Sequence, residues 1–269
     1  MTNLRPAAIA LISCVALAAA PAASAKPTVT VSGSTSFFPL MTDLIPAFLK
    51  EKGPVAKFSV FGGGSDVGIA DAAYGRATMG MTSRDEKGAD AHGLGWSRIA
   101  RDAICLVTNR ANPLANLDSN TVRRIFTGKT VNWKNVPGSK LKTPINVIGR
   151  TISSGTQDMF EKLFLGYSQY VTRKASLKAT NGLVQNSVKA DKNAIGYVSM
   201  GFVNGLASIP YDGVTCNLKN AKSGNYLAVR NFWLVTPGQP NGIAKTFINW
   251  AQTSRNAQAV IARGYVPLN

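Results

Sequence analysis

The chain has 269 residues, 45% of them hydrophobic and 8% aromatic, and its 30 Lys and Arg against 13 Asp and Glu give a formal net charge of +17. This composition is typical of a globular protein and excludes a disordered or fibrous chain. The length suffices for two lobes of about 120 residues each. We interpret the positive charge as a sign of an anionic partner, which by charge alone could be a nucleic acid, an anionic surface or a small oxyanion.

The first 25 residues have the pattern of a secretory signal peptide. Arg5 gives a positive start, an apolar stretch follows, and Ala-Ser-Ala at 23–25 is a small-residue cleavage site. The apolar stretch, at about 14 residues, is shorter than the ~20 that a membrane-spanning helix needs. We therefore expect export and cleavage after Ala25, which makes the mature protein periplasmic or secreted. The residues Leu11 to Cys14 resemble the cleavage site of a lipoprotein. They leave one alternative open, in which the protein is anchored to a membrane through Cys14.

Three segments of the mature chain predict the same unit, a strand followed by a turn rich in Gly and Ser and then by a helix. They span residues 28–49, 57–74 and 143–166. In each, alternating or β-branched residues give way to apolar residues at helical spacing. Strands that alternate with helices indicate an α/β architecture with largely parallel sheets.

Two further apolar strands are predicted at residues 102–110 and 231–237. If both cross between two lobes, they form a hinge, and a C-terminal helix around Ile243 to Ala262 joins the first lobe. The expected division is a signal peptide at 1–25, a first lobe at 26–106 plus 232–269, and a second lobe at 107–231.

The turns can bind an anion. A helix N-terminus presents unpaired N–H groups and a partial positive charge, and Ser or Thr hydroxyls there can donate further hydrogen bonds. Arg150, four residues before Ser154, adds a planar fork that suits phosphate-like oxygens. The alternative is that each turn is an ordinary helix cap.

The sequence contains few residues that could form a catalytic or metal centre. His92 is the only histidine in the sequence, it lies in a glycine-rich loop, and no GxSxG motif is present. Two cysteines remain after processing, Cys105 and Cys216, and the sequence leaves open whether they are bridged. We expect no catalytic residue, no metal and no cofactor. A secreted serine hydrolase that uses Ser154 remains the most distant alternative.

The lysines and arginines are scattered singly, without the interleaved aromatic residues that stack nucleic-acid bases. We therefore expect no nucleic-acid partner. Arg123, Arg124 and Lys129 are interpreted as a solvated helix face.

The turns resemble those of the periplasmic phosphate-binding proteins of ABC importers, including their short relatives. The resemblance covers essentially the whole mature chain. The similar segments are "GSTSFFP" (33–39), "GGGSDVGI" (62–69), "MGMTSR" (79–84), "SNTVRRIFTGKTVNW" (119–133), "RTISSGTQDMF" (150–160), "NAIGYVSMGFV" (193–203) and "SGNYLAVRNFWLVT" (223–236).

This resemblance implies an α/β, two-lobed type II periplasmic-binding-protein fold with a hinge of two crossing strands. It implies a monomer, not an enzyme, that captures inorganic phosphate between its lobes and delivers it to the permease subunits of an ABC importer. A relative used as an extracellular sensor or adhesion protein is the alternative. Carried over by motif, the ligand-binding residues are Ser34, Thr35, Ser36, Ser65, Ser83, Arg150, Ser154, Gly155 and Thr156.

The chain departs from the family at the third turn. In the best-known branch an aspartate there accepts the proton of hydrogen phosphate, and it repels sulfate, which has no proton to donate. Here Ser83 stands at or near that place, followed by Arg84 and Asp85. Asp66 and Asp85 are candidates for the role, although each is also explained as a solvated carboxylate at a helix start. The choice between phosphate and sulfate therefore stays open at the level of sequence.

Overall fold

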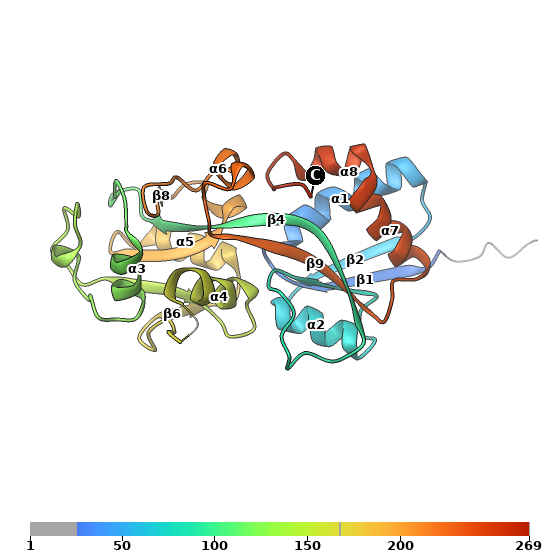
Figure 1. The fold of residues 1–269 in the computed structure, drawn as a ribbon, viewed down its shortest axis with the longest axis horizontal. Coiled ribbons are helices and arrows are strands. Elements are labelled where there is room, and N and C mark those ends of the chain that lie inside the picture. The colour runs from blue at the N-terminus through green and yellow to red at the C-terminus, as the bar shows by residue number, and fades with distance from the viewer. Residues whose placement is uncertain (1–25, 167, 269) are drawn as a thin grey trace, which may run out of the picture.

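The protein has two hydrophobic cores at opposite ends of its long axis, and two long strands run between them (Figure 1). These strands are β4 (Leu94–Thr108) and β9 (Val229–Pro237). The computed structural model describes residues 26–166 and 168–268. The predicted signal peptide, with Cys14, lies outside the described residues. We call the elements packed around each core a lobe.

The first lobe holds the first two predicted strand-turn-helix units, which the structure confirms. Strand β1 pairs in parallel with β2 and β3, and β3 pairs antiparallel with β9. Helices α1, α7 and α8 share its core, where Phe48 packs edge-on against Phe247 and Trp250. The elements are β1 (Thr28–Gly33), α1 (Phe38–Lys52), β2 (Lys57–Gly62), α2 (Ser65–Ala73), β3 (Met79–Thr82), α7 (Gly242–Thr253) and α8 (Arg255–Ile261).

The C-terminal helix expected around Ile243 to Ala262 is two helices, so that prediction was wrong in detail. Ser254 has an extended backbone between α7 and α8. Its hydroxyl accepts a hydrogen bond from the backbone N–H of Asn256 and so caps the start of α8.

The second lobe contains the third predicted unit, whose strand β5 runs parallel to β6 and β7. Its helix begins as α4, continues as a π-helical turn over Glu161–Leu165 and ends at Gly166, which has a φ of 89°. Phe160 stacks on Tyr197 in the core. The elements are α3 (Ser119–Phe126), β5 (Asn146–Arg150), α4 (Gly155–Phe160), β6 (Ser176–Lys178), α5 (Asn181–Ala190), β7 (Ala194–Ser199), β8 (Ala207–Ile209) and α6 (Leu218–Ser223), with 3-10 turns at Trp133–Asn135 and Met200–Phe202.

The two cysteines that the sequence left open form a disulfide. Cys105 on β4 is bonded to Cys216, in the segment before α6, across 111 positions of the chain. Both residues are buried in the second core.

Strands β4 and β9 join the lobes. They pair antiparallel from Leu94 opposite Pro237 to Ala103 opposite Val229, with one register shift near Ile99. All the strands lie in one connected sheet with the order β2-β1-β3-β9-β4-β7-β5-β6, in which β8 pairs with β4. In the described part of the chain, no helix is both long and apolar enough to cross a membrane.

Candidate anion-binding site

The turns that follow β1, β2, β3 and β5 meet where the two lobes face each other. Ser36 Oγ lies 3.0 Å from Thr156 Oγ1, and Ser65 Oγ lies 3.3 Å from Ser83 Oγ. The backbone N–H of Asp66 also donates to the carbonyl of Ser153 across the lobes. Ser36, Ser65, Ser83 and Thr156 are all buried. The structure thus brings together four turns that the sequence predicts as separate elements.

Gly155 lies at a close approach of the two lobes. A Cβ atom at this position would overlap Ser65 Oγ and lie 2.9 Å from Ser83 Oγ. Any side chain here would therefore push the first lobe away from α4. The requirement for glycine comes from contact between the lobes, since no unusual backbone angle is needed at this residue.

The residues of the turn after β1 have two different roles. The hydroxyl of Ser34 accepts hydrogen bonds from the backbone N–H groups of Ser36 and Phe37, so it supports the start of α1. Thr35 Oγ1 accepts a bond from Arg150 in the second lobe, at 3.2 Å. Ser36 Oγ faces the hydroxyl of Thr156.

Arg150 ends β5 and lies in the wall formed by the second lobe. Its Nε donates to the carbonyl of Lys178, and its Nη2 donates to the carbonyl of Ala179 and to Thr35. Its Nη1 is buried and has no partner among the described residues, and Arg150 as a whole is 2% exposed. Burial lowers the pKa of Arg150 to about 10, and the nearby charge of Arg230 adds to this shift. A buried cationic donor without an acceptor is costly, so this geometry favours a bound anion.

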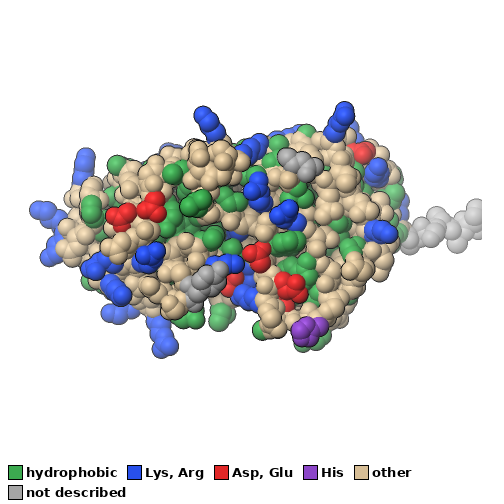
Figure 2. Space-filling model, viewed as in Figure 1, with side chains coloured by type: hydrophobic (Ala, Val, Ile, Leu, Met, Phe, Trp, Pro, Cys, Tyr) green, Lys and Arg blue, Asp and Glu red, His purple; other side chains and the backbone are tan. Residues whose placement is uncertain are grey.

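Ser154 is a helix cap. Its Oγ accepts hydrogen bonds from the backbone N–H groups of Thr156 and Gln157 at the start of α4. His92, the only histidine of the sequence, is exposed on the surface (Figure 2) and makes no hydrogen bond with Ser154. Among the described residues no base is hydrogen-bonded to the hydroxyl of Ser154, whose oxygen accepts only from backbone N–H groups.

The sequence analysis missed Arg230 on β9 and Asp102 on β4. Arg230 donates to Thr156 Oγ1 at 2.9 Å and to Ser36 Oγ at 2.9 Å, so it contacts a hydroxyl of each lobe. Its Nη2 also lies 2.8 Å from Asp102 Oδ2, and both side chains are fully buried. The signal in the sequence was charge within strand segments: Asp102 stands beside Arg101 in β4, and Arg230 is the only charged residue of β9.

Asn181, the first residue of α5, was also missed. Its Nδ2 donates to Ser36 Oγ at 2.8 Å, and its Oδ1 accepts from the backbone N–H of Ser199 at 3.0 Å. Asn181 is fully buried. It thus links the end of β7 to the first lobe through the same hydroxyl that Arg230 contacts.

We call the buried hydroxyl-bearing residues Ser36, Ser65, Ser83 and Thr156, together with Arg150, the cage. The third turn places Arg84 away from this cage. Its Nε lies 2.8 Å from Asp66 Oδ1, and its Nη2 lies 2.7 Å from Asp90 Oδ1. Ser83, the neighbouring residue, instead donates its backbone N–H to Ser65 Oγ. The carboxylate of Asp66 is therefore occupied by an arginine.

The second candidate acceptor, Asp85, also makes its hydrogen bonds outside the cage. Its Oδ1 accepts from Asn231 Nδ2 at 3.0 Å and from Trp233 Nε1 at 3.1 Å. Neither Asp85 nor Asp66 is hydrogen-bonded to a hydroxyl of the cage. The acceptors that the cage itself offers are the oxygens of its Ser and Thr hydroxyls.

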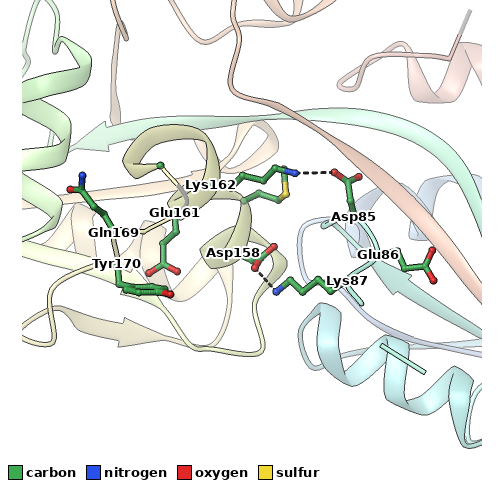
Figure 3. Close-up of a pocket in the computed structure, with 10 residues that line it drawn as sticks. Asp85, Glu86, Lys87, Asp158, Glu161, Lys162, Gln169 and Tyr170 are labelled. Carbon is green, nitrogen blue, oxygen red and sulfur yellow. Dashed lines mark ion pairs between the residues drawn. The ribbon is translucent and has the colours of Figure 1, made fainter. Parts of the chain in front are cut away.

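Two ion pairs close one side of the junction between the lobes. Lys87 of the first lobe pairs with Asp158 of α4, and Asp85 of the first lobe lies 3.8 Å from Lys162 of the second (Figure 3). Each lobe thus contributes one acid and one base. The four side chains line a cavity of about 280 Å³. The pairs are partly exposed, so each stabilises the contact only modestly.

The comparisons with known proteins agree with this fold. The sequence profile described as a PBP superfamily domain matches residues 18–255, and the chain belongs to that superfamily. It is 26% identical to the Phosphate-binding protein PstS of Bacillus subtilis over 250 residues, which cover 91% of this chain and 82% of the relative.

Two solved structures are similar over most of their length. One, from Clostridium perfringens, is described as a candidate phosphate ABC transporter substrate-binding protein with bound phosphate. It superposes with a TM-score of 0.84 and 31% identity, covering 90% of this chain and 100% of that one. The other is an ABC-type phosphate transport receptor from Vibrio cholerae, with a TM-score of 0.72, 28% identity and coverage of 88% and 99%. The type II periplasmic-binding-protein fold expected from the sequence is thereby confirmed.

Proposed function

We propose that this protein binds inorganic phosphate between its two lobes and delivers it to the permease subunits of an ABC importer. The observation that carries the proposal is the buried Nη1 of Arg150, which has no acceptor among the described residues and lies in a cage of hydroxyls. The similar proteins whose names specify phosphate support this choice of anion.

In this proposal the ligand contacts both lobes. The second lobe supplies Arg150, Thr156 and the N-terminus of α4, and the first lobe supplies Thr35, Ser36, Ser65 and Ser83. Ser154 adds its hydroxyl hydrogen and Gly155 its backbone N–H, whereas Ser34 supports the turn. Because the ligand binds both walls, it favours the closed arrangement over an open one. The hinge would divide the chain into residues 26–106 with 232–269 and residues 107–231.

The predicted signal peptide places this function outside the cytoplasm, in the periplasm or at the cell surface. The protein would act as a monomer that carries its ligand, without catalysis. The strongly positive net charge would raise the local concentration of anions near the cleft.

Calorimetric titration with phosphate and with sulfate at neutral pH tests the proposal. We expect phosphate to bind with one site per chain. A buried acceptor left unpaired gives discrimination of about 10⁴-fold or more. Because hydroxyls can accept as well as donate, we expect discrimination against sulfate to be smaller than this here. No heat and no thermal stabilisation with phosphate would contradict the proposal.

A further inference from the structure

The positive charge is unevenly divided between the lobes. Residues 107–231 hold 17 Lys and Arg against 5 Asp and Glu, whereas residues 26–106 and 232–269 together hold 12 against 8. Within the second lobe, residues 119–157 contain no acidic residue at all. Of the basic residues in that stretch, the phosphate cage uses only Arg150, so most of this charge has no role in the proposed site.

Six of these cations gather at the end of the second lobe that lies farthest from the first. Figure 1 places the loop after α3 at this end, and Figure 2 shows basic side chains projecting from it. All six residues are exposed. We call them the basic end: Lys129, Lys134, Lys140, Lys142, Arg173 and Lys174.

Backbone contacts hold the segments of the basic end together. The N–H of Thr172 donates to the carbonyl of Phe126 at 2.7 Å, which places Arg173 and Lys174 beside the end of α3. The N–H of Trp133 donates to the carbonyl of Thr143 at 2.9 Å, which places Lys142 beside Lys134. The cations therefore share one surface, although they come from separate parts of the chain.

No cation of the basic end is paired with a carboxylate within the described residues. By contrast, Arg84, Lys87 and Lys162 near the cleft are all paired with carboxylates. A surface that serves solubility mixes both signs, because like charges repel one another. These cations are therefore free to contact the anionic groups of a partner.

The geometry of this surface fits a membrane better than a small anion. In the proposed cage around Arg150 a small anion would be held by buried donors, whereas the basic end consists of exposed side chains. Val131, an apolar residue, is 56% exposed in the same loop. Clustered exposed cations beside an apolar side chain suit the anionic headgroups of a lipid bilayer.

We propose that the basic end docks this protein on bilayers that contain anionic phospholipids. Docking through the far end of one lobe leaves the cleft between the lobes uncovered. The contact is electrostatic, so it weakens as salt screens the charges. It does not depend on which anion the cleft binds.

Co-sedimentation of the purified protein with lipid vesicles tests the proposal. The probes are vesicles of phosphatidylcholine alone and of phosphatidylcholine with phosphatidylglycerol. We expect binding only to the anionic vesicles, with at least a tenfold loss when the salt concentration is raised from low to high. A variant that combines Lys129→Glu, Lys134→Glu, Lys140→Glu and Lys142→Glu should lose at least tenfold in binding.

The matched control changes the same number of charges on the first lobe, through Lys50→Glu, Lys57→Glu, Lys245→Glu and Arg263→Glu, all at exposed positions. It should keep most of the vesicle binding. Equal losses in the two variants would show that net charge alone matters and would overturn the proposal. Equal binding to neutral and anionic vesicles, or binding to soluble polyphosphate without binding to vesicles, would overturn it too. Thermal unfolding of both variants confirms that they are folded, and phosphate titration of both separates this result from the function of the cleft.

Discussion

Arg230 and Asp102 face each other on the two strands that join the lobes, with Arg230 Nη2 2.8 Å from Asp102 Oδ2. The sheet register pairs the same two residues. The guanidinium of Arg230 also reaches Ser36 in the first lobe and Thr156 in the second. The hinge strands therefore carry a cation that contacts both walls of the cage, and a carboxylate behind it compensates the charge.

Replacing Asp102 with Asn keeps the shape of the side chain and removes this compensation. A buried charge that loses its partner typically costs about 3–5 kcal/mol, so the free energy of unfolding without phosphate should fall by roughly that amount. Bound phosphate would neutralise Arg230 instead. Thermal unfolding should therefore show a larger phosphate-induced rise in Tm for Asp102→Asn than for the wild type.

Ser199→Ala is the matched control for Asp102→Asn. The hydroxyl of Ser199 donates to the same carboxylate at 3.0 Å, and its loss changes no charge. We expect this variant to be less stable but to show the same phosphate-induced rise as the wild type. If Asp102→Asn also shows an unchanged rise, Arg230 does not act on the ligand.

Gly155→Ala tests the close approach of the lobes. The added methyl group would overlap Ser65 Oγ only when the lobes are together. Alanine is a good helix former, so α4 itself should tolerate it. We expect phosphate affinity to fall at least tenfold with little loss of stability without phosphate, measured by calorimetry and thermal unfolding. Gly264→Ala, at a position where a Cβ meets open space, should leave affinity unchanged. Wild-type affinity in Gly155→Ala would mean that ligand binding does not require this contact.

Lys87→Met removes one of the two ion pairs between the lobes. A partly exposed pair stabilises by about 0.2–1 kcal/mol, so phosphate should dissociate roughly one and a half to five times faster. Salt should accelerate dissociation from the wild type more than from the variant. Stopped-flow measurement at two salt concentrations checks both effects. The exposed Lys245 of α7 provides the control, as Lys245→Met, and a similar change in the two variants would count against a role for the Lys87 ion pair.

Arg84→Met tests whether the ion pairs of Arg84 with Asp66 and Asp90 stabilise the third turn. Burial opposes ionisation of Asp90, but its hydrogen bonds with Arg84 outweigh this and lower the pKa of the carboxyl below its usual range. A carboxyl with a lowered pKa stabilises the fold at neutral pH, and this stabilisation is lost as the pH falls below about 4. The variant should be about 2–3 kcal/mol less stable at pH 7.

The difference between Arg84→Met and the wild type should shrink at pH 3, where the carboxyl is increasingly protonated. Denaturant unfolding at the two pH values measures this difference. Arg76→Met, which breaks an exposed pair with Asp71, should have little effect at either pH. A difference for Arg84→Met that does not change with pH would show that the pairing of Asp90 is not its cause.

The parts of the site that sequence reasoning found are local. Each turn lies between a strand and a helix that the hydrophobic pattern predicts, so Ser36, Ser65 and Thr156 could be placed at helix starts. The disulfide could not be predicted, since it depends on contact between segments distant in the sequence. The break at Ser254 had a local signal, a serine that caps the start of α8, which the sequence analysis did not use.

The parts that were missed depend on register and packing. Arg230 and Asp102 meet because β4 and β9 pair in one register, and no local signal fixes it. Asn181 is an ordinary helix-start residue in the sequence, and only the tertiary structure brings its side chain to Ser36 of the first lobe. The orientation of Arg84 also follows from tertiary structure, because Asp90 lies in a loop that folds back beside α2.

Phosphate titration of Arg150→Ala against the wild type tests the central claim most directly. A charged hydrogen bond contributes about 1.5–3 kcal/mol, so we expect affinity to fall by roughly ten- to a hundredfold or more while the protein stays folded. Arg263→Ala, at an exposed arginine of the first lobe, should bind like the wild type. Unchanged phosphate affinity in Arg150→Ala would contradict the account, because the buried guanidinium would then serve the fold and not the ligand.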